Sequence, residues 1–311
     1  SGAARIVTVR MRPLTLAERG VETPTISLAR LLGGGRPRLD GNTAVGVEQY
    51  AEEIVGSGFP GLRGLTGRLL RAQLDGYVDG IVEHDLERVG AGVRDPGQVR
   101  RWLTAYAAAS STTATYERIR TAVSGADGVV PTRKAATPYR VMLERLWVID
   151  PVPAWLPTRN HLRRLASPPK HQLVDPALAA RLLGVGVGAL LDAAQAPVAP
   201  RDATLLGALF ESLVTLDVRV YAQAAEAATH HLRTAAGEQE IDLVVVRDDG
   251  RVVAIEVKLA RTVADADVRH LRWLSDRLGE DLLDAIVVTT GETAYRRPDG
   301  IGVVPAALLG A

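Results

Sequence analysis

Residues 240–258 read EIDLVVVRDDGRVVAIEVK, and this stretch decides the fold. It holds two runs rich in β-branched residues, Glu240–Val246 and Val252–Lys258. Between them stand Asp248, Asp249 and Gly250, and an Asp-Gly pair flanked by apolar alternation is a strong signal for a tight hairpin turn. The stretch therefore predicts two adjacent antiparallel strands.

The register of this hairpin brings charges together. If it closes symmetrically on Asp249, Asp242 pairs with Glu256 and Glu240 pairs with Lys258. Directly opposed side chains have Cβ atoms roughly 5 Å apart, and like charges at that separation destabilise a sheet. A divalent cation between Asp242 and Glu256 would turn this repulsion into binding.

Both faces of the predicted hairpin are apolar. One face carries Ile241, Leu243, Val245, Val253, Ile255 and Val257, and the other carries Val244, Val246, Val252 and Ala254, with Asp242, Glu256 and Lys258 at one end. Strands that are apolar on both faces are central and are covered on both sides. Charges at their ends are therefore expected to be partly buried, and hence paired, protonated or bound to metal.

Carboxylates in this arrangement suit Mg²⁺, which typically takes one or two of them together with water and substrate phosphate. Asp242 and Glu256 are the candidate metal ligands, and Glu211, on a predicted helix upstream, is a candidate third. Lys258 would orient an attacking water or stabilise charge on a phosphate. In the alternative interpretation, Lys258 only forms a cross-strand ion pair with Glu240, in a rim of solvated charges.

Two histidines are weaker candidates for the same site. If residues 235–238 close a second hairpin, His231 faces Asp242 and Arg233 faces Glu240. His270 lies on the predicted helix that follows the strands. Either histidine is equally well explained as an ordinary strand or helix-surface residue.

Composition excludes several classes of protein. The 311 residues are 47% hydrophobic and 23% charged, which is ordinary for a globular protein of two or three domains. A net charge of +1 provides no global attraction to nucleic acid or membranes. The absence of cysteine excludes disulfides and thiolate metal sites and is consistent with a cytoplasmic protein. No apolar run is long enough to span a membrane, so no membrane partner is expected.

The predicted fold class is α/β, with a helical N-terminal part followed by a mixed sheet. Apolar residues recur at helical spacing over 45–55, 65–89, 98–110, 112–124 and 205–214, and again over 263–278. Besides the hairpin, the predicted strands are 5–11, 217–222, 229–234 and 282–290. We expect three domains, at 1–94, 95–198 and 199–311, with boundaries at Arg94-Asp95-Pro96-Gly97 and Pro197-Val198-Ala199-Pro200. Short helices followed by a small extended element indicate a winged-helix module in the second.

The order helix glutamate, aspartate, Glu-x-Lys hairpin and helix resembles the PD-(D/E)xK nuclease superfamily. The resemblance implies a restriction-endonuclease-like fold for residues 199–311. It also implies that Asp242, Glu256 and Lys258 form the core motif and that Glu211 is the acid of the first helix. Ile241 stands where many members have proline, a departure found among divergent members.

A wider resemblance covers nearly the whole chain. It rests on Arg5–Arg19, Gly58-Phe59-Pro60, Leu74–Val78 with His84-Asp85, Pro153–Trp155, Pro169-Lys170, Asp175–Leu178, Leu209–Val214 and His230–Thr234. Together these segments resemble the rear part of a family of prokaryotic AAA-type ATP-binding proteins, which join a P-loop ATPase, a winged helix and a C-terminal domain of unknown function. The resemblance implies that residues 1–94 are a strand and helical remnant of the ATPase core.

This sequence lacks the phosphate-binding loop of that family. No stretch has the form G-x-x-x-x-G-K-[ST], and Gly33-Gly34-Gly35-Arg36-Pro37 reads as a plain loop. ATPase activity is therefore not expected of this chain, and ATP would bind only in a full-length protein that carries the missing N-terminal ATPase domain. Arg5, Arg10 and Arg12 are either remnants of a nucleotide-facing edge or solvated strand arginines.

The segment between Pro131 and His171 is basic. Its candidate residues for nucleic-acid contact are Arg133, Lys134, Arg140, Arg163 and Arg164. Such a face on a winged helix could contact phosphates. The competing interpretation, a solvated surface or a docking face for the missing ATPase, is slightly favoured because the net charge is near zero.

Two functional hypotheses follow. In the first, the chain is a Mg²⁺-dependent DNA nuclease that uses Glu211, Asp242, Glu256 and Lys258. In the second, it is a non-catalytic nuclease-fold module that couples the ATPase to a protein or DNA partner. The oligomeric state, including a homo-oligomer, is left open by the sequence.

Overall fold

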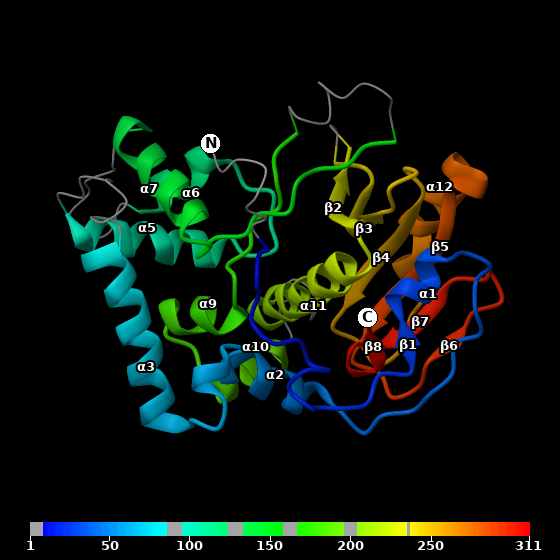
Figure 1. The fold of residues 1–311 in the computed structure, drawn as a ribbon, viewed down its shortest axis with the longest axis horizontal. Coiled ribbons are helices and arrows are strands. Elements are labelled where there is room, and N and C mark those ends of the chain that lie inside the picture. The colour runs from blue at the N-terminus through cyan, green and yellow to red at the C-terminus, as the bar shows by residue number, and fades with distance from the viewer. Residues whose placement is uncertain (1–8, 86–94, 124–132, 158–166, 196–203, 235–236) are drawn as a thin grey trace, which may run out of the picture.

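The computed structural model describes residues 9–85, 95–123, 133–157, 167–195, 204–234 and 237–311. Helices dominate the N-terminal part and a mixed sheet forms the C-terminal part, which confirms the predicted α/β class (Figure 1). The helices are α1 (Leu28–Leu32), α2 (Val47–Gly56), α3 (Gly67–Gly80), α5 (Pro96–Ala108), α6 (Tyr116–Ala122), α7 (Arg133–Arg145), α9 (Pro176–Leu182), α10 (Val187–Gln195), α11 (Leu205–Ala224) and α12 (Arg269–Leu278).

The sheet has the strand order β2-β3-β4-β5-β7-β6. Its strands are β2 (Ala228–Arg233), β3 (Glu240–Val246), β4 (Val252–Lys258), β5 (Leu282–Thr289), β6 (Tyr295–Arg296) and β7 (Gly302–Pro305). Strands β2, β3 and β4 are antiparallel, whereas β4, β5 and β7 run parallel. The chain thus passes through helix, three strands, helix and strand, the order predicted from the sequence.

The predicted hairpin register is confirmed. The pairs run from Leu243 opposite Ile255 to Val246 opposite Val252, so the turn is centred on Asp249. Gly250 has a φ of +86°, a conformation that glycine adopts without steric strain. Asp242 and Glu256 come directly after the last of these pairs, and the predicted pairing of Glu240 with Lys258 is not part of the register.

Both faces of the strands are buried, also as predicted. Leu243, Val245, Val253 and Ile255 share a core with α11, whereas Val244, Val252 and Ala254 share a second core with α12. Ile241 departs from the prediction, because it joins the α12 core and not that of Leu243. The pairing of β2 with β3 shifts between His230 and Leu232, and a bulge of this kind reverses the facing of the residues beyond it.

Two predicted strands at other positions are not confirmed. Residues 217–222 are helical, since α11 continues for 20 residues to Ala224. Val218, Tyr221 and Ala222 follow the helical spacing of the buried residues before them, and their packing outweighs the strand preference of their side chains. Of predicted strand 5–11, residues 5–8 lie outside the described residues and 9–11 form no strand.

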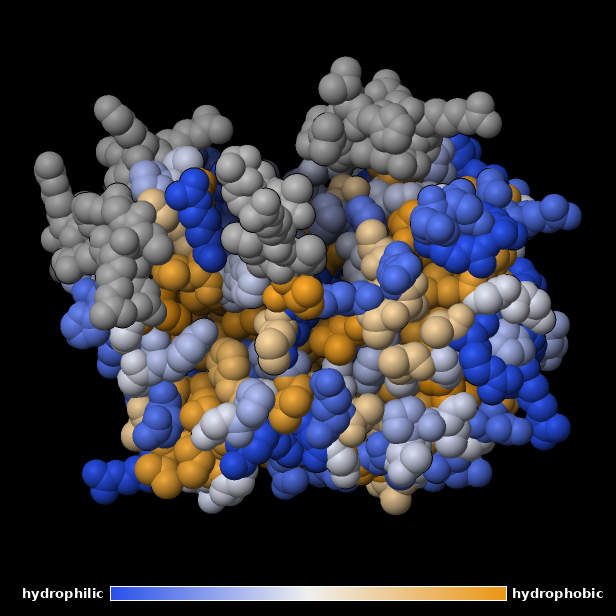
Figure 2. Space-filling view, viewed as in Figure 1, coloured by the Kyte–Doolittle hydropathy of each residue, from blue (hydrophilic) through white to orange (hydrophobic). Residues whose placement is uncertain are grey.

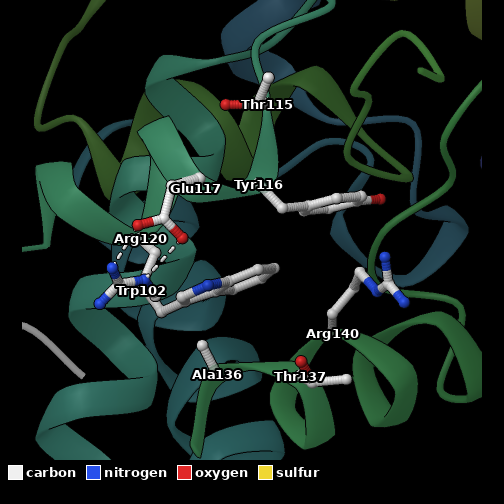
Figure 3. A pocket seen from close by; sticks show the side chains of 8 residues that line it. All are labelled: Trp102, Thr115, Tyr116, Glu117, Arg120, Ala136, Thr137 and Arg140. Atoms are coloured by element: carbon white, nitrogen blue, oxygen red, sulfur yellow. Dashed lines mark hydrogen bonds and ion pairs between the residues drawn. The ribbon is translucent and has the colours of Figure 1, made fainter. Parts of the chain in front are cut away.

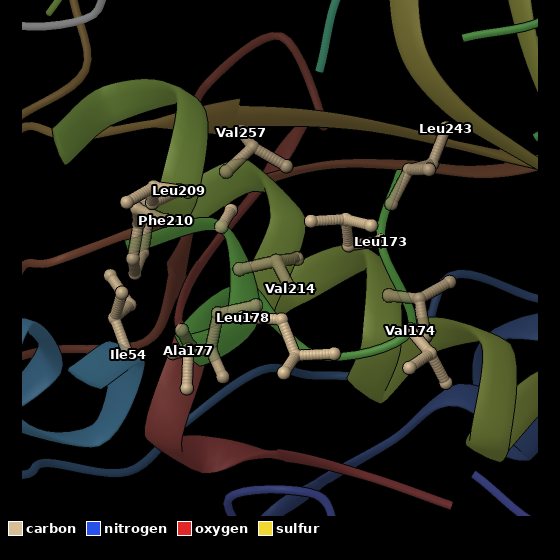
Figure 4. Packing of buried hydrophobic residues seen from close by; sticks show 14 of the residues in the cluster. Ile54, Leu173, Val174, Ala177, Leu178, Leu209, Phe210, Val214, Leu243 and Val257 are labelled. Carbon is tan, nitrogen blue, oxygen red and sulfur yellow. The ribbon is translucent and has the colours of Figure 1, made fainter. Parts of the chain in front are cut away.

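One core joins the parts of the chain. Figure 4 shows side chains of α2, α9, α11, β3 and β4 packed against one another, with Leu173 and Val174 among them. In Figure 1, α11 runs between the helices and the sheet. Strand β1 (Ile26–Ser27) pairs in parallel with β8 (Leu309–Gly310), which ties the N-terminal part to the end of the chain.

The predicted domain boundaries stay predictions. Arg94 and the linker Pro197–Pro200 lie outside the described residues. After α7, isolated bridges pair Ile149 with Leu173 and Val152 with Lys170. In the described part of the chain, no helix combines the length and apolar character needed to span a bilayer. The face seen in Figure 2 mixes hydrophilic and hydrophobic side chains, with hydrophilic ones gathered over α12.

Asp284 in β5 provides a test of this packing. Its side chain is fully buried and forms a bidentate ion pair with Arg296 (2.6 and 2.9 Å), which also bonds the carbonyl of Pro37. Arg296→Ala leaves that carboxylate unpaired and should lower the free energy of unfolding by about 3–5 kcal/mol. The half-exposed pair of Arg272 and Asp299 is the control. Arg272→Ala should change the free energy of unfolding by at most about 1 kcal/mol. Equal effects of the two substitutions in urea denaturation would show that the buried charge of Asp284 is stable without Arg296.

Candidate functional site

The predicted site residues converge where α11 meets the ends of β3 and β4. Glu211 comes from the second turn of α11, Asp242 from β3, and Glu256 and Lys258 from β4. A residue outside the prediction, Lys170, lies at the centre of this group. The arrangement therefore differs from an open cluster of carboxylates.

Lys170 links two of the acids directly. Its Nζ donates to Glu211 Oε1 at 2.7 Å and to Asp242 Oδ1 at 2.9 Å. The Lys170 side chain is only 1% exposed. Burial favours the neutral amine, but the charge of Asp242 and the hydrogen bonds to Asp242 and Glu211 raise the pKa of Lys170. Lys170 is consequently a buried ammonium ion.

The three carboxyl groups are held in different protonation states. Burial opposes ionisation of Asp242, but Lys170 and Lys258 outweigh it and lower the pKa of Asp242 to about 2. Burial and the Asp242 charge raise the pKa of Glu211 to about 8, and they also raise the pKa of Glu256. The site therefore favours the ionised form of Asp242 and the protonated forms of Glu211 and Glu256.

Most of the oxygen atoms that a metal would need are already in use. Asp242 Oδ2 accepts the backbone N–H of Val257 at 2.9 Å, and Oδ1 accepts from Lys170. Among the described residues, no group of three or more His, Cys, Asp or Glu side chains is arranged to hold a metal ion. A divalent cation requires several accessible oxygen ligands, so the site in this conformation does not fit Mg²⁺.

Glu256 and Lys258 lie side by side at the end of β4. The Lys258 Nζ is 4.0 Å from Glu256 Oε2. Glu256 is almost fully buried, and its Oε1 has no hydrogen-bond partner among the described residues. A buried acceptor without a partner is uncommon, and it marks this oxygen as the one place in the centre that a further donor could occupy.

The weaker candidates have other partners. Arg233 pairs with Glu240 at 3.1 Å, as the second hairpin predicted. His231 lies at the bulge, and its Nε2 contacts the carbonyl of Pro168 at 3.1 Å. Burial and repulsion from Lys170 lower the pKa of His231 to about 4. His270 Nδ1 contacts Gln239 Oε1 at 2.6 Å, on the rim of the site.

Lys170 is the functional residue that sequence reasoning missed. In the sequence it belongs to the basic segment, where its neighbours Pro168 and Pro169 indicate a loop. The structure buries it because its segment pairs with Val152 and reaches α11. The signal available in the sequence was the excess of acid in the hairpin, which requires a cation from elsewhere in the chain.

The candidates for nucleic-acid contact that the structure describes lie on α7, apart from this centre. Arg163 and Arg164 are outside the described residues, and Arg133 and Lys134 belong to the first turn of α7. Arg140 lines a cavity of about 510 Å³ between α5, α6 and α7 (Figure 3). Its guanidinium group lies 4.5 Å from the ring centre of Tyr116. Nucleic-acid contact through this segment stays a prediction.

Two family models match parts of the chain. The model of a domain of unknown function, DUF4143, matches residues 206–309, which hold most of α11 and the six-stranded sheet. The model of a second domain of unknown function, DUF8612, matches residues 47–189. No curated protein and no solved structure matches the chain. Lys170 lies in the second of these matches, whereas Glu211, Asp242, Glu256 and Lys258 lie in the first.

The protonated state of Glu211 predicts a pH dependence. Its pKa is about 8 in the folded protein against an ordinary value of 4.5, so its contribution to stability is full below about pH 4.5 and is lost as the pH rises through 8. Between pH 6.5 and 8, the free energy of unfolding should fall more steeply in the wild type than in Glu211→Gln, by up to about 1.4 kcal/mol per pH unit.

Thermal and urea unfolding at several pH values measure this difference. Glu280→Gln, at an exposed position, is the control. Its free energy of unfolding should change with pH as steeply as that of the wild type. Identical slopes for Glu211→Gln and the wild type would show that Glu211 is ionised in the folded protein.

Proposed function

We propose that this chain is a non-catalytic module with a nuclease-like fold, and that it couples an AAA-type ATPase to a protein or DNA partner. One observation carries the proposal: the Lys170 ammonium bonds two of the three carboxyl groups that a nuclease would use for its metal. The order of elements from α11 to β5 supports the nuclease-like fold. The resemblance of segments along the chain to ATP-binding proteins supports the ATPase partner.

The energetics favour a permanent ion pair. Withdrawing Lys170 would leave Asp242 charged and buried, and breaking such a pair destabilises a protein by about 3–5 kcal/mol. A metal would have to compensate that loss and would share Asp242 with the N–H of Val257. The centre therefore acts as a structural tie in this conformation.

That tie spans the two matched domains. Lys170 pairs through its backbone with Val152 in the middle part of the chain, and its side chain bonds α11 and β3. A displacement of the middle part would pull a buried ammonium away from its counter-charges. Such a contact transmits movement between the two parts, which is the property that a coupling module needs.

The partners and location belong to the same proposal. The ATPase would be supplied by a P-loop domain that this sequence does not contain, and with it ATP. A cytoplasmic location and assembly into a homo-oligomer are consistent with a cysteine-free chain that serves an ATPase.

A second candidate function is Mg²⁺-dependent hydrolysis of DNA phosphodiesters by Glu211, Asp242, Glu256 and Lys258. The observation in its favour is the unpartnered Oε1 of Glu256 beside Asp242 and Lys258. It requires a conformation in which Lys170 has left the centre.

Metal titration separates the two functions. By isothermal titration calorimetry, the wild type and Lys170→Arg should bind neither Mn²⁺ nor Mg²⁺, and neither ion should raise their melting temperatures. Lys170→Ala removes the internal cation and should gain Mn²⁺ binding, since three carboxyl groups then share an uncompensated site. Adding Asp242→Asn to Lys170→Ala should abolish the gain.

A cleavage assay supplies the opposite outcome. The wild type is incubated with plasmid and single-stranded DNA in Mg²⁺ or Mn²⁺, beside Glu256→Ala. Cleavage by the wild type that Glu256→Ala loses would overturn the non-catalytic module and establish the nuclease. The wild-type measurements decide the question even if Lys170→Ala fails to fold.

A further inference from the structure

Three arginine side chains converge on a single carboxylate on another side of α11. Asp150 Oδ1 accepts from Arg10 Nη1 at 2.7 Å and forms an ion pair with Arg219 Nη2 at 2.8 Å, and Oδ2 accepts from Arg12 Nε at 3.0 Å. Asp150 is buried, and so is most of the Arg12 side chain, which is 9% exposed. Three positive charges thus surround one negative charge.

Among the described residues, no other acid balances this excess charge. Asp150 is the only carboxylate in the described part of the chain that is paired with any of these three arginines. Their other bonds go to neutral acceptors, including Gln223 Oε1 for Arg12 at 2.9 Å and the Asp150 carbonyl for Arg219 at 2.8 Å.

The positive charges of these arginines are not fully neutralised by their neighbours. The Nε of Arg10 is buried and has no hydrogen-bond partner among the described residues. Burial lowers the pKa of Arg219 to about 10, and burial together with Arg12 lowers the pKa of Arg10. Buried charges are normally paired, so two unmatched guanidinium charges indicate an absent anion.

The cluster can be reached from solvent. The Arg10 side chain is 22% exposed and lies over the ring of Trp147, 5.2 Å from its centre. Trp147 is itself 37% exposed, whereas the side chains of Arg12 and of Arg219, which belongs to α11, are less exposed than that of Arg10, at 9% and 13%. An incoming anion would therefore meet Arg10 first and the more deeply buried arginines next.

We propose that Arg10, Arg12 and Arg219 form a binding site for a phosphate group. A phosphate dianion matches the two unbalanced charges, whereas a carboxylate would leave one of them. Guanidinium groups present paired N–H donors that match phosphate oxygens, and such charge-assisted bonds are among the stronger ones in proteins. Free phosphate and the phosphates of a nucleotide share this chemistry. The site is independent of the acidic centre, and it stands whichever function that centre has.

Calorimetric titration of the full chain with inorganic phosphate, AMP and ATP, in the absence of divalent metal and at constant ionic strength, tests the site. Phosphate should bind the wild type and raise its melting temperature. Arg10→Gln, the most exposed member, should fold and weaken binding about tenfold or more, and Arg10→Lys should weaken it less. Arg38→Gln, which alters an 88% exposed arginine in a surface pair, is the matched control and should bind as the wild type does.

The three ligands distinguish the possible sources of the phosphate group. Tighter binding of AMP or ATP than of phosphate identifies a nucleotide as the source of the group, whereas equal binding identifies free phosphate. Absence of binding by all three ligands overturns the proposal. So does equal weakening by Arg10→Gln and Arg38→Gln, because attraction by general surface charge would then explain the binding.

Discussion

The buried ammonium of Lys170 is the interaction on which the rest of the structure depends. The hairpin brings Asp242 and Glu256 together, and α11 adds Glu211, so this end of the sheet gathers three carboxyl groups in a nearly dry environment. Such a cluster is unstable without a cation or protons. Lys170 supplies the cation, burial favours the protonated forms of Glu211 and Glu256, and Asp242 carries the negative charge.

Other buried charges serve the same purpose at other points of the fold. The side chain of Asp284 in β5 forms an ion pair with Arg296 in β6. Asp217, in the middle of α11, accepts the backbone N–H of Leu16 at 3.2 Å, and burial raises its pKa to about 7. Each of these carboxyl groups joins segments that are distant in sequence or topology. The parts of the chain are thereby held together by polar contacts as well as by their shared core.

The sequence predicts those features that depend on neighbours along the chain. The hairpin register follows from Asp249 and Gly250 at the turn, and β5 follows from a run that is apolar apart from Asp284 and Thr289. Features that depend on tertiary contacts are harder to predict from the sequence. The strand predicted over 217–222 is helical because its side chains complete a buried helix face, which is known only once the sheet is in place. The bulge at His231 and the burial of Lys170 likewise depend on the segment around Pro153 and Pro168, far away in sequence.

The two charged centres beside α11 differ in what they lack. At the acidic centre, an internal lysine and two protons satisfy the carboxyl groups, and a ligand would have to displace a bond that already exists. At the arginine cluster, one aspartate faces three guanidinium groups, and an anion would add a bond where none is present. Binding is favoured where charge is uncompensated, since the ligand then relieves repulsion instead of competing with an internal partner. By this criterion, the arginine cluster is the better binding site, and the acidic centre, which gave the first indication of function, is the better structural tie.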